Sequence, residues 1–163
     1  MDSEALGGKT VTILLVDDDS IDAKAVERAF RKAKIANPIV RAKDGVEALE
    51  ALRGENGREK IAMPFLLLVD LNMPRMGGID LIRNIREDKK LQQAIIFILT
   101  TSKQDEDIIA AYQLNVAGYI VKSNIGKDFM ELTNMLEHYW RVIEFPRKSE
   151  KVRIDGVYEQ SES

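Results

Sequence analysis

Acidic, hydroxyl and amine side chains follow the apolar segments of this sequence, at places where they could do chemistry together. Asp17 and Asp18 follow one apolar segment, Asp70 a second, Thr100 a third and Lys122 a fourth. Carboxylates that crowd together repel one another unless they are protonated or hold a cation, and all-oxygen ligands suit a hard ion such as Mg²⁺. If the fold gathers these residues, the sequence predicts a magnesium site beside a hydroxyl and an amine.

The apolar segments alternate with segments of helical periodicity. Short continuous β-branched runs predict strands, and apolar residues three and four apart predict helices. Strands are expected at residues 11–16, 38–42, 65–70, 94–100 and 117–121, and helices near 20–33, 44–53, 77–88, 104–115 and 126–144. Ser20 is the expected N-cap of the first helix, and residues 54–64 are expected to form a long loop. The chain therefore contains five β-α units.

Continuous apolar strands joined by helices are typical of a mostly parallel sheet covered on both faces, the doubly wound α/β class. In that class ligands bind at the carboxyl ends of the strands. The residues named above all follow strand ends, so the fold is expected to gather them at one edge. A single Asp or Thr after a strand is more often an ordinary turn residue, which is the interpretation given to Asp19. The prediction of a functional site therefore rests on the placement of all these residues together at the ends of strands.

Composition and charge exclude several classes of function. The chain has 163 residues, about one domain, and 24 Lys and Arg against 27 Asp and Glu give a net charge of −3, which leaves no broad basic surface for nucleic acid. There is no cysteine for disulfides or thiolate metal sites. The N-terminus lacks the basic and apolar regions of a signal peptide, and no apolar run is long enough to span a membrane. We expect a cytoplasmic protein that binds neither nucleic acid nor membrane directly.

Four motifs together resemble the receiver domain of response regulators in two-component signalling. They are LLVDDDS, LLVDLNMPRMGG, FILTTS and GYIVKS, and they occur in this order within residues 10–144. The resemblance implies a flavodoxin-like parallel sheet with strand order 2-1-3-4-5 and five helices. It leaves residues 1–9 as a flexible N-terminus and residues 145–163 as a C-terminal arm or tail.

The resemblance also implies how the acidic residues work. Asp70 would accept a phosphoryl group from a phosphohistidine on a sensor histidine kinase. Mg²⁺ would be bound directly by Asp18, by Asp70 and by the backbone carbonyl of Asn72, and through water by Asp17. Met73, Pro74 and the two glycines that follow in this motif would turn the chain sharply so that the Asp70 carboxylate stays open. The chain would catalyse its own phosphoryl transfer and autodephosphorylation, and act mainly as a switch.

Three further residues are implied in the response to phosphorylation. Lys122 would pair with Asp70 and then with a phosphoryl oxygen, Thr100 would move to bond a phosphoryl oxygen, and Tyr119 would follow it inward. The alternative for Tyr119 is an ordinary aromatic on an edge strand. Receivers usually follow this lysine with a proline in a cis bond, whereas Ser123 stands here. The Lys122–Ser123 bond is therefore expected to be either trans or strained.

Features outside the motifs indicate the partners. The longer loop at 54–64, the YWRVIEFP segment and the absence of an effector domain resemble the small regulators that pair with cyanobacterial and bacterial phytochrome kinases. A homodimer is expected through the last helix and the arm from Pro146. Met135, Val142 and Phe145 add apolar surface beyond the arc that faces the sheet, and such an excess is typical of a partner surface. The alternative is an arm that folds back within one chain.

Three other functions compete with the receiver. DDDSI at 17–21 nearly fits the Asp-x-Asp motif of haloacid-dehalogenase-like phosphatases, in which Asp17 would be the nucleophile, but the chain is short and lacks a cap domain. A flavodoxin-like flavin binder would share the sheet order, but three acids stand where its phosphate loop would be. A receiver-like interaction module that works without phosphorylation is the more serious alternative.

Overall fold

The computed structural model describes residues 11–71, 73, 76–100, 106–128 and 130–131, in which strands and helices alternate. The strands are β1 (Thr12–Val16), β2 (Ile39–Ala42), β3 (Phe65–Asp70), β4 (Ile95–Thr100) and β5 (Gly118–Val121). The helices are α1 (Ser20–Lys32), α2 (Gly45–Arg53), α3 (Gly78–Glu87) and α4 (Glu106–Tyr112), and the 3-10 turn η2 (Lys122–Asn124) follows β5.

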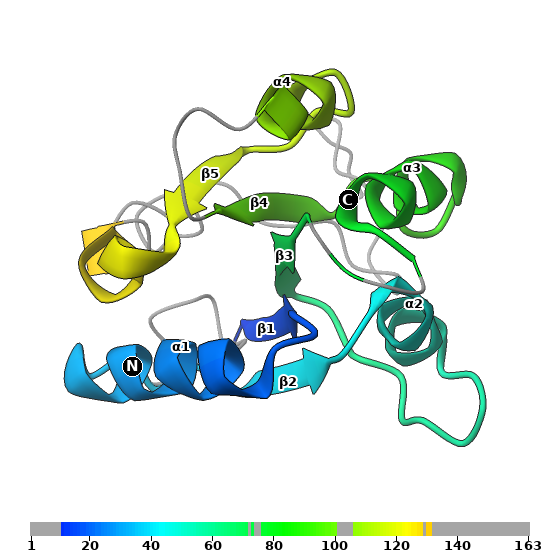
Figure 1. Cartoon of the computed structure of the whole chain (residues 1–163). Coiled ribbons are helices and arrows are strands. Elements are labelled where there is room, and N and C mark those ends of the chain that lie inside the picture. Colours follow the sequence, from blue (N-terminus) through cyan, green and yellow to red (C-terminus); the bar gives the residue numbers. More distant parts are fainter. Residues whose placement is uncertain (1–10, 72, 74–75, 101–105, 129, 132–163) are drawn as a thin grey trace, which may run out of the picture.

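The five strands form one parallel sheet in the order β2-β1-β3-β4-β5. Figure 1 shows α1 on one face of the sheet and α2, α3 and α4 on the other. The predicted doubly wound fold and its strand order are therefore confirmed. Because all strands run in the same direction, their carboxyl ends lie along one edge.

Two hydrophobic clusters lie on opposite faces of the sheet, which explains why β3 is apolar at five consecutive positions. Leu66 and Leu68 belong to the cluster that includes buried residues of α1, whereas Leu67 and Val69 belong to the cluster that includes α2 and α3. All five apolar residues of β3 are at most 8% exposed, because helices cover both faces of a central parallel strand. β3 therefore gives Asp70 a rigid support.

Aspartates cap the first two helices. Asp19 Oδ1 accepts hydrogen bonds from the backbone N–H groups of Ile21 (2.8 Å) and Asp22 (3.2 Å). The predicted cap at Ser20 is thus wrong by one residue, because Asp19 keeps an extended backbone and Ser20 is already the first residue of α1. In α2 the cap is Asp44, whose Oδ1 accepts from the N–H of Glu47 at 2.9 Å.

The last predicted helix lies largely outside the described residues. Residues 125–128, 130 and 131 have helical backbone, in agreement with a helix that starts near residue 126. Ile125 packs in the same cluster as α1. Residues 54–64 join α2 to β3 without a further helix or strand, as predicted. Within the described part of the chain, no helix is both long and apolar enough to cross a membrane.

Candidate functional site

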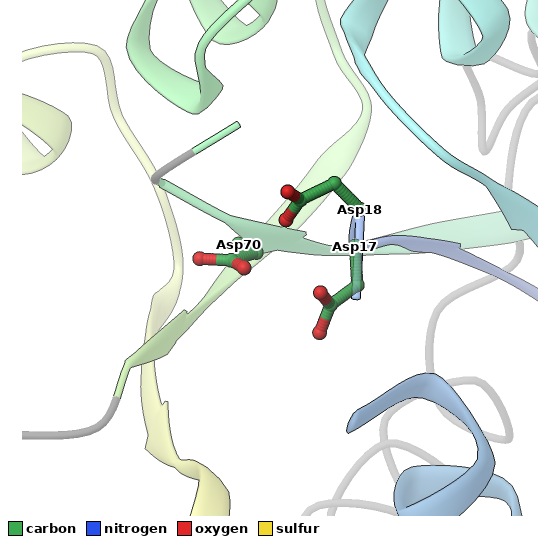
Figure 2. A group of neighbouring side chains, drawn as sticks. All are labelled: Asp17, Asp18 and Asp70. Atoms are coloured by element: carbon green, nitrogen blue, oxygen red, sulfur yellow. The ribbon is translucent and has the colours of Figure 1, made fainter. Parts of the chain in front are cut away.

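The ends of two neighbouring strands bring three aspartates together. Asp17 and Asp18 follow β1, and Asp70 is the last residue of β3. One carboxylate oxygen of each lies within 4.8 Å of the others, and Figure 2 shows the three side chains at the strand ends. Asp17 and Asp70 are buried, whereas Asp18 is exposed. The structure therefore forms the predicted acidic cluster, with one member open to solvent.

Asp17 is held by hydrogen bonds on both its backbone and its side chain. Its carbonyl accepts from Arg41 Nε at 3.2 Å and Arg41 Nη2 at 2.9 Å, and its N–H donates to the Ala42 carbonyl at 3.0 Å. Asp17 Oδ1 accepts from the Asp19 N–H at 3.0 Å. The other carboxylate oxygen, Oδ2, makes no hydrogen bond within the described residues but lies 3.2 Å from Lys122 Nζ. The Asp17 carboxylate is thus fixed and fully buried.

Lys122 is a cation at this edge, and it contacts three carboxylates. Its Nζ lies 2.9 Å from Asp22 Oδ2, 3.2 Å from Asp17 Oδ2 and 3.3 Å from Asp70 Oδ2. Burial by itself lowers the pKa of Lys122, but the hydrogen bond to Asp22 and the negative charges of Asp70 and Asp17 outweigh burial and raise the pKa above its ordinary value. Lys122 therefore stays protonated and balances one of the negative charges around it.

The peptide bond that follows Lys122 is trans. Among the described residues the cis bond is Met63–Pro64, so the Lys122–Ser123 bond is trans, which was one of the two expectations. Lys122 begins η2, directly after the end of β5. The lysine therefore reaches Asp70 without the usual proline after it.

A close backbone contact fixes the chain as it leaves Asp70. The Gly78 N–H donates to the Leu71 carbonyl at 3.0 Å. A Cβ on Gly78 would lie 2.6 Å from Leu71 Cα and 2.7 Å from the Asp70 carbonyl oxygen, whereas a Cβ on Gly77 would have its nearest neighbour at 3.7 Å. Glycine is thus required at position 78 by close packing. Gly77 has an ordinary φ of −67°, so it is not needed for the predicted sharp turn.

Thr100 and Tyr119 lie on the same face of two neighbouring strands. Thr100 pairs with Val121, and Tyr119 is two residues earlier in β5, so strand alternation places both side chains on one face. Thr100 is buried, and Tyr119 is half-buried against the cluster that includes α2 and α3. Asp70 pairs with Leu99, the residue before Thr100. The two residues are therefore neighbours beside the acidic cluster.

The oxygen donors of the cluster fit a hard divalent cation. Three carboxylates from two strands offer ligand atoms close enough to share one ion. Asp17 Oδ2 is a buried oxygen without a hydrogen bond from the described residues, which is the kind of atom that a cation satisfies. Asn72, whose carbonyl belongs to the predicted ligand set, lies outside the described residues.

Sequence reasoning missed two residues of this edge, Asp22 and Arg41. Asp22 contacts Lys122 from the first turn of α1, and Arg41 reaches the Asp17 carbonyl from β2. An acid three residues after a helix cap is an ordinary helix signal, and nothing in the spacing connects it with residue 122. The strand order places β2 beside β1, which is the only signal that could have pointed to Arg41.

A doubly wound sheet of this order, with an acidic cluster and a lysine at its carboxyl edge, is the arrangement of a receiver domain. A model of the response regulator receiver domain family matches residues 13–136, and the chain belongs to this family. The predicted family, the fold class and the function as a receiver in two-component signalling are thereby confirmed. Response regulators of this family work with sensor histidine kinases.

Similar proteins include regulators linked to phytochromes. The chain is 31% identical over 128 residues to the response regulator Rcp1 of Synechocystis sp., and the match covers 78% of this chain and 87% of Rcp1. The crystal structure of the Mn²⁺-bound form of Rcp1 is similar with a TM-score of 0.64 and 30% identity, covering 84% of this chain and 99% of Rcp1. The bacteriophytochrome response regulator AtBRR is similar with a TM-score of 0.67 and 26% identity, covering 87% of this chain and 99% of AtBRR.

Proposed function

We propose that the chain accepts a phosphoryl group on Asp70 from a phosphohistidine of a sensor kinase. The observation that carries this proposal is the contact of 3.3 Å between Lys122 Nζ and Asp70 Oδ2 beside the acidic cluster. In the transfer an Asp70 carboxylate oxygen attacks phosphorus, and the new O–P bond forms as the N–P bond of the phosphohistidine breaks. The imidazole leaves with the electron pair of that bond and takes up a proton.

The acidic cluster is the proposed binding place for Mg²⁺. Asp18 and Asp70 are the proposed direct ligands together with the carbonyl of Asn72, and Asp17 acts through a water molecule. The existence of a Mn²⁺-bound form of the similar protein Rcp1 supports the binding of a divalent ion. When bound, Mg²⁺ neutralises charge on the transferring group. Lys122 adds a fixed positive charge that contacts a phosphoryl oxygen once Asp70 is phosphorylated.

Thr100 and Tyr119 form the proposed switch. Their common face and their neighbouring strands support a coupled movement, in which the Thr100 hydroxyl bonds a phosphoryl oxygen and the Tyr119 ring moves into the space that Thr100 leaves. The movement would change the surface over α4 and β5, and a partner would read that change.

A phytochrome-type kinase is the proposed donor. The similarity to AtBRR and to a second bacteriophytochrome response regulator, RtBRR, supports it, at 26% identity and TM-scores of 0.67 and 0.66. We propose receiver boundaries of 10–144, which enclose the family match. Residues 1–9 and 145–163 would be the flexible N-terminus and the arm. A cytoplasmic location stays a prediction that rests on the amino-acid sequence.

A homodimer through the last helix and the arm is proposed on the sequence pattern, since Val142 and Phe145 lie outside the described residues. We expect light scattering after chromatography, at tens of micromolar protein, to give about twice the 18.4 kDa of the monomer. Val142→Glu combined with deletion after Phe145 should restore the monomer. A wild-type mass near 18.4 kDa, or a dimer that survives both changes, would exclude this interface.

The phosphatase alternative makes a different residue the nucleophile. Asp17 is fully buried, one of its carboxylate oxygens accepts the Asp19 N–H, and the other contacts Lys122. These contacts leave Asp17 poorly placed to attack a phosphoryl donor. The interaction-module alternative predicts no covalent change at all.

One labelling experiment separates these functions. The protein is incubated with acetyl phosphate and Mg²⁺, and its intact mass is measured. We expect the wild type to gain one phosphoryl group, and Asp70→Asn or removal of Mg²⁺ to abolish the gain. Labelling of Asp70→Asn but not of Asp17→Asn would support the phosphatase-like chemistry, and an unlabelled wild type would support the interaction module.

A further inference from the structure

We infer that Asp22 is a positioning residue that competes with the phosphoryl group for Lys122 and so slows phosphorylation, an inference that rests on the proposed phosphorylation of Asp70. Asp22 Oδ2 lies 2.9 Å from Lys122 Nζ, closer than the carboxylate of Asp70 at 3.3 Å. Asp22 lies outside the acidic cluster that fits a cation.

The first turn of α1 explains why the Asp22 side chain is available for Lys122. Asp22 is the third residue of the helix after the cap Asp19, where an acidic side chain often bonds back to the N–H of the cap. Here the Asp19 N–H donates to Asp17 Oδ1 instead, and Asp22 Oδ2 accepts a hydrogen bond from Lys122. The positive end of the helix dipole also favours a carboxylate at this position.

Lys122 shares its positive charge among three carboxylates, and it donates hydrogen bonds to two of them, Asp22 and Asp70. An ammonium group carries three N–H donors, and Lys122 Nζ contacts three carboxylates within 3.3 Å. To follow a phosphoryl oxygen on Asp70, Lys122 must move from the position in which it also contacts Asp17 and Asp22, and one of these two contacts is then weakened. The release of a partner therefore contributes to the barrier for phosphorylation.

Burial decides which partner Lys122 gives up. The Asp17 side chain is 0% exposed, so the loss of Lys122 would leave a buried carboxylate without its counter-charge. The Asp22 side chain is 41% exposed, so water can replace the lysine there. Asp22 is thus the partner that is released, and until then it holds Lys122 back from the phosphoryl group.

The same geometry adds a direct electrostatic effect. The carboxylates of Asp22 and Asp70 contact one ammonium group, so an incoming phosphoryl donor approaches a second negative charge beside Asp70. A dianionic donor such as acetyl phosphate is repelled more strongly than phosphoramidate, which carries less negative charge. Salt weakens such repulsion at a partly exposed site.

The test compares labelling rates of five proteins by intact mass at saturating Mg²⁺. They are the wild type, Asp22→Asn, Asp22→Ser, Asp22→Glu and the control Asp80→Asn. Asp80 is the matched control because it also lies three residues after a helix cap, is exposed, and pairs with Arg83 instead of with Lys122. Each variant is first checked for cooperative melting, and Asp22→Ser serves as a second neutral variant that suits a first helical turn.

We expect Asp22→Asn and Asp22→Ser to label about two- to fivefold faster than the wild type with acetyl phosphate, the range for one partly exposed charge pair. The acceleration should be smaller with phosphoramidate and should shrink as salt is added. Asp22→Glu, which keeps the charge, and Asp80→Asn should label at close to the wild-type rate.

Four results would overturn the inference. Slower labelling of the neutral variants would mean that Asp22 holds Lys122 in its productive position. Equal acceleration by Asp80→Asn would mean that labelling becomes faster because the overall negative charge of the protein is smaller, and not because Asp22 releases Lys122. A wild type that takes up no phosphoryl group, like Asp70→Asn, would contradict the phosphorylation itself and with it the role of Asp22, whereas labelling that depends on Asp70 but not on Asp22 would contradict the role of Asp22 alone.

Discussion

Lys122 provides positive charge beside the carboxylates at the carboxyl edge of the sheet. It is the positive partner of the buried Asp17 and of Asp70, and its side chain is 16% exposed. Removing one member of a buried ion pair is costly because the other charge is left without a partner. The stability of the metal-free protein should therefore depend on this single side chain.

We predict that Lys122→Met lowers the free energy of unfolding by about 2 kcal/mol in the absence of divalent ions. Chemical denaturation in EDTA measures the difference, and saturating Mg²⁺ should reduce it because the ion supplies the missing positive charge. Lys43→Met is the matched control, since Lys43 is 67% exposed and pairs with Glu47 at 3.6 Å on the surface. A surface pair of this kind contributes about 0.2–1 kcal/mol. Equal losses in the two variants would contradict the role given to Lys122.

The same two proteins give a prediction for pH. The pKa of Lys122 is raised above its ordinary value of 10.5, so its contribution to stability is fully present below pH 10.5 and is lost as the pH rises through the pKa of the folded state. The stability difference between wild type and Lys122→Met should therefore stay constant from neutral pH to the ordinary lysine pKa. A difference that already disappears between pH 7 and pH 9 would show that the lysine loses its proton too early for this account.

The turn between β3 and α3 is set by one of its two glycines. A Cβ at position 78 would collide with the backbone of Leu71 and Asp70, where a shift would also move Asp70, the proposed phosphoacceptor. We predict that Gly78→Ala costs about 1–3 kcal/mol of stability, as expected for overpacking against backbone, and that it slows labelling of Asp70.

Gly77→Ala is the control for this prediction. Its Cβ would have room, its φ is ordinary, and the change should alter stability by less than about 1 kcal/mol. Thermal and chemical unfolding of the two variants are compared with the wild type. Similar losses at both positions would mean that turn conformation, and not the contact with Leu71, is what requires glycine here.

Local patterns in the sequence predicted the strands well, and the reason is physical. The sequence predicts β3 at residues 65–70 and the structure has it at Phe65–Asp70, because a strand buried on both faces has a short continuous apolar run bounded by turn residues. Parallel strands have their carboxyl ends at one edge of the sheet, so the proximity of Asp17, Asp18 and Asp70 could also be predicted. These features depend on periodicity and topology, which a single sequence carries.

Contacts between side chains distant in the sequence could not be predicted in the same way. Whether Asp19 or Ser20 caps α1 depends on one backbone torsion, and both residue types are good caps. The Asp22–Lys122 contact joins residues 100 positions apart and depends on the angle at which α1 lies on the sheet. Which of two adjacent glycines packs against Leu71 is likewise decided by tertiary structure.

Binding of Mg²⁺ should stabilise the entire fold, because the acidic cluster exists only when β1 and β3 are paired. A ligand that binds the folded state alone adds about 2.7 kcal/mol at 100 times its dissociation constant. We predict a rise in melting temperature with Mg²⁺, measured by calorimetry, and a much smaller rise for Asp18→Asn, which removes one exposed carboxylate of the cluster. If saturating Mg²⁺ does not change the melting temperature of the wild type, the proposed metal site is contradicted.

The position of the phosphoryl group on the chain can be read out directly by chemical trapping. After incubation with acetyl phosphate and Mg²⁺, borohydride reduces an aspartyl phosphate to homoserine, and peptide mass spectrometry locates the changed residue. We predict homoserine at position 70, and none when Mg²⁺ is removed by EDTA. Homoserine at position 17, or no homoserine in a protein that binds Mg²⁺, would contradict the assignment of Asp70 as the phosphoacceptor.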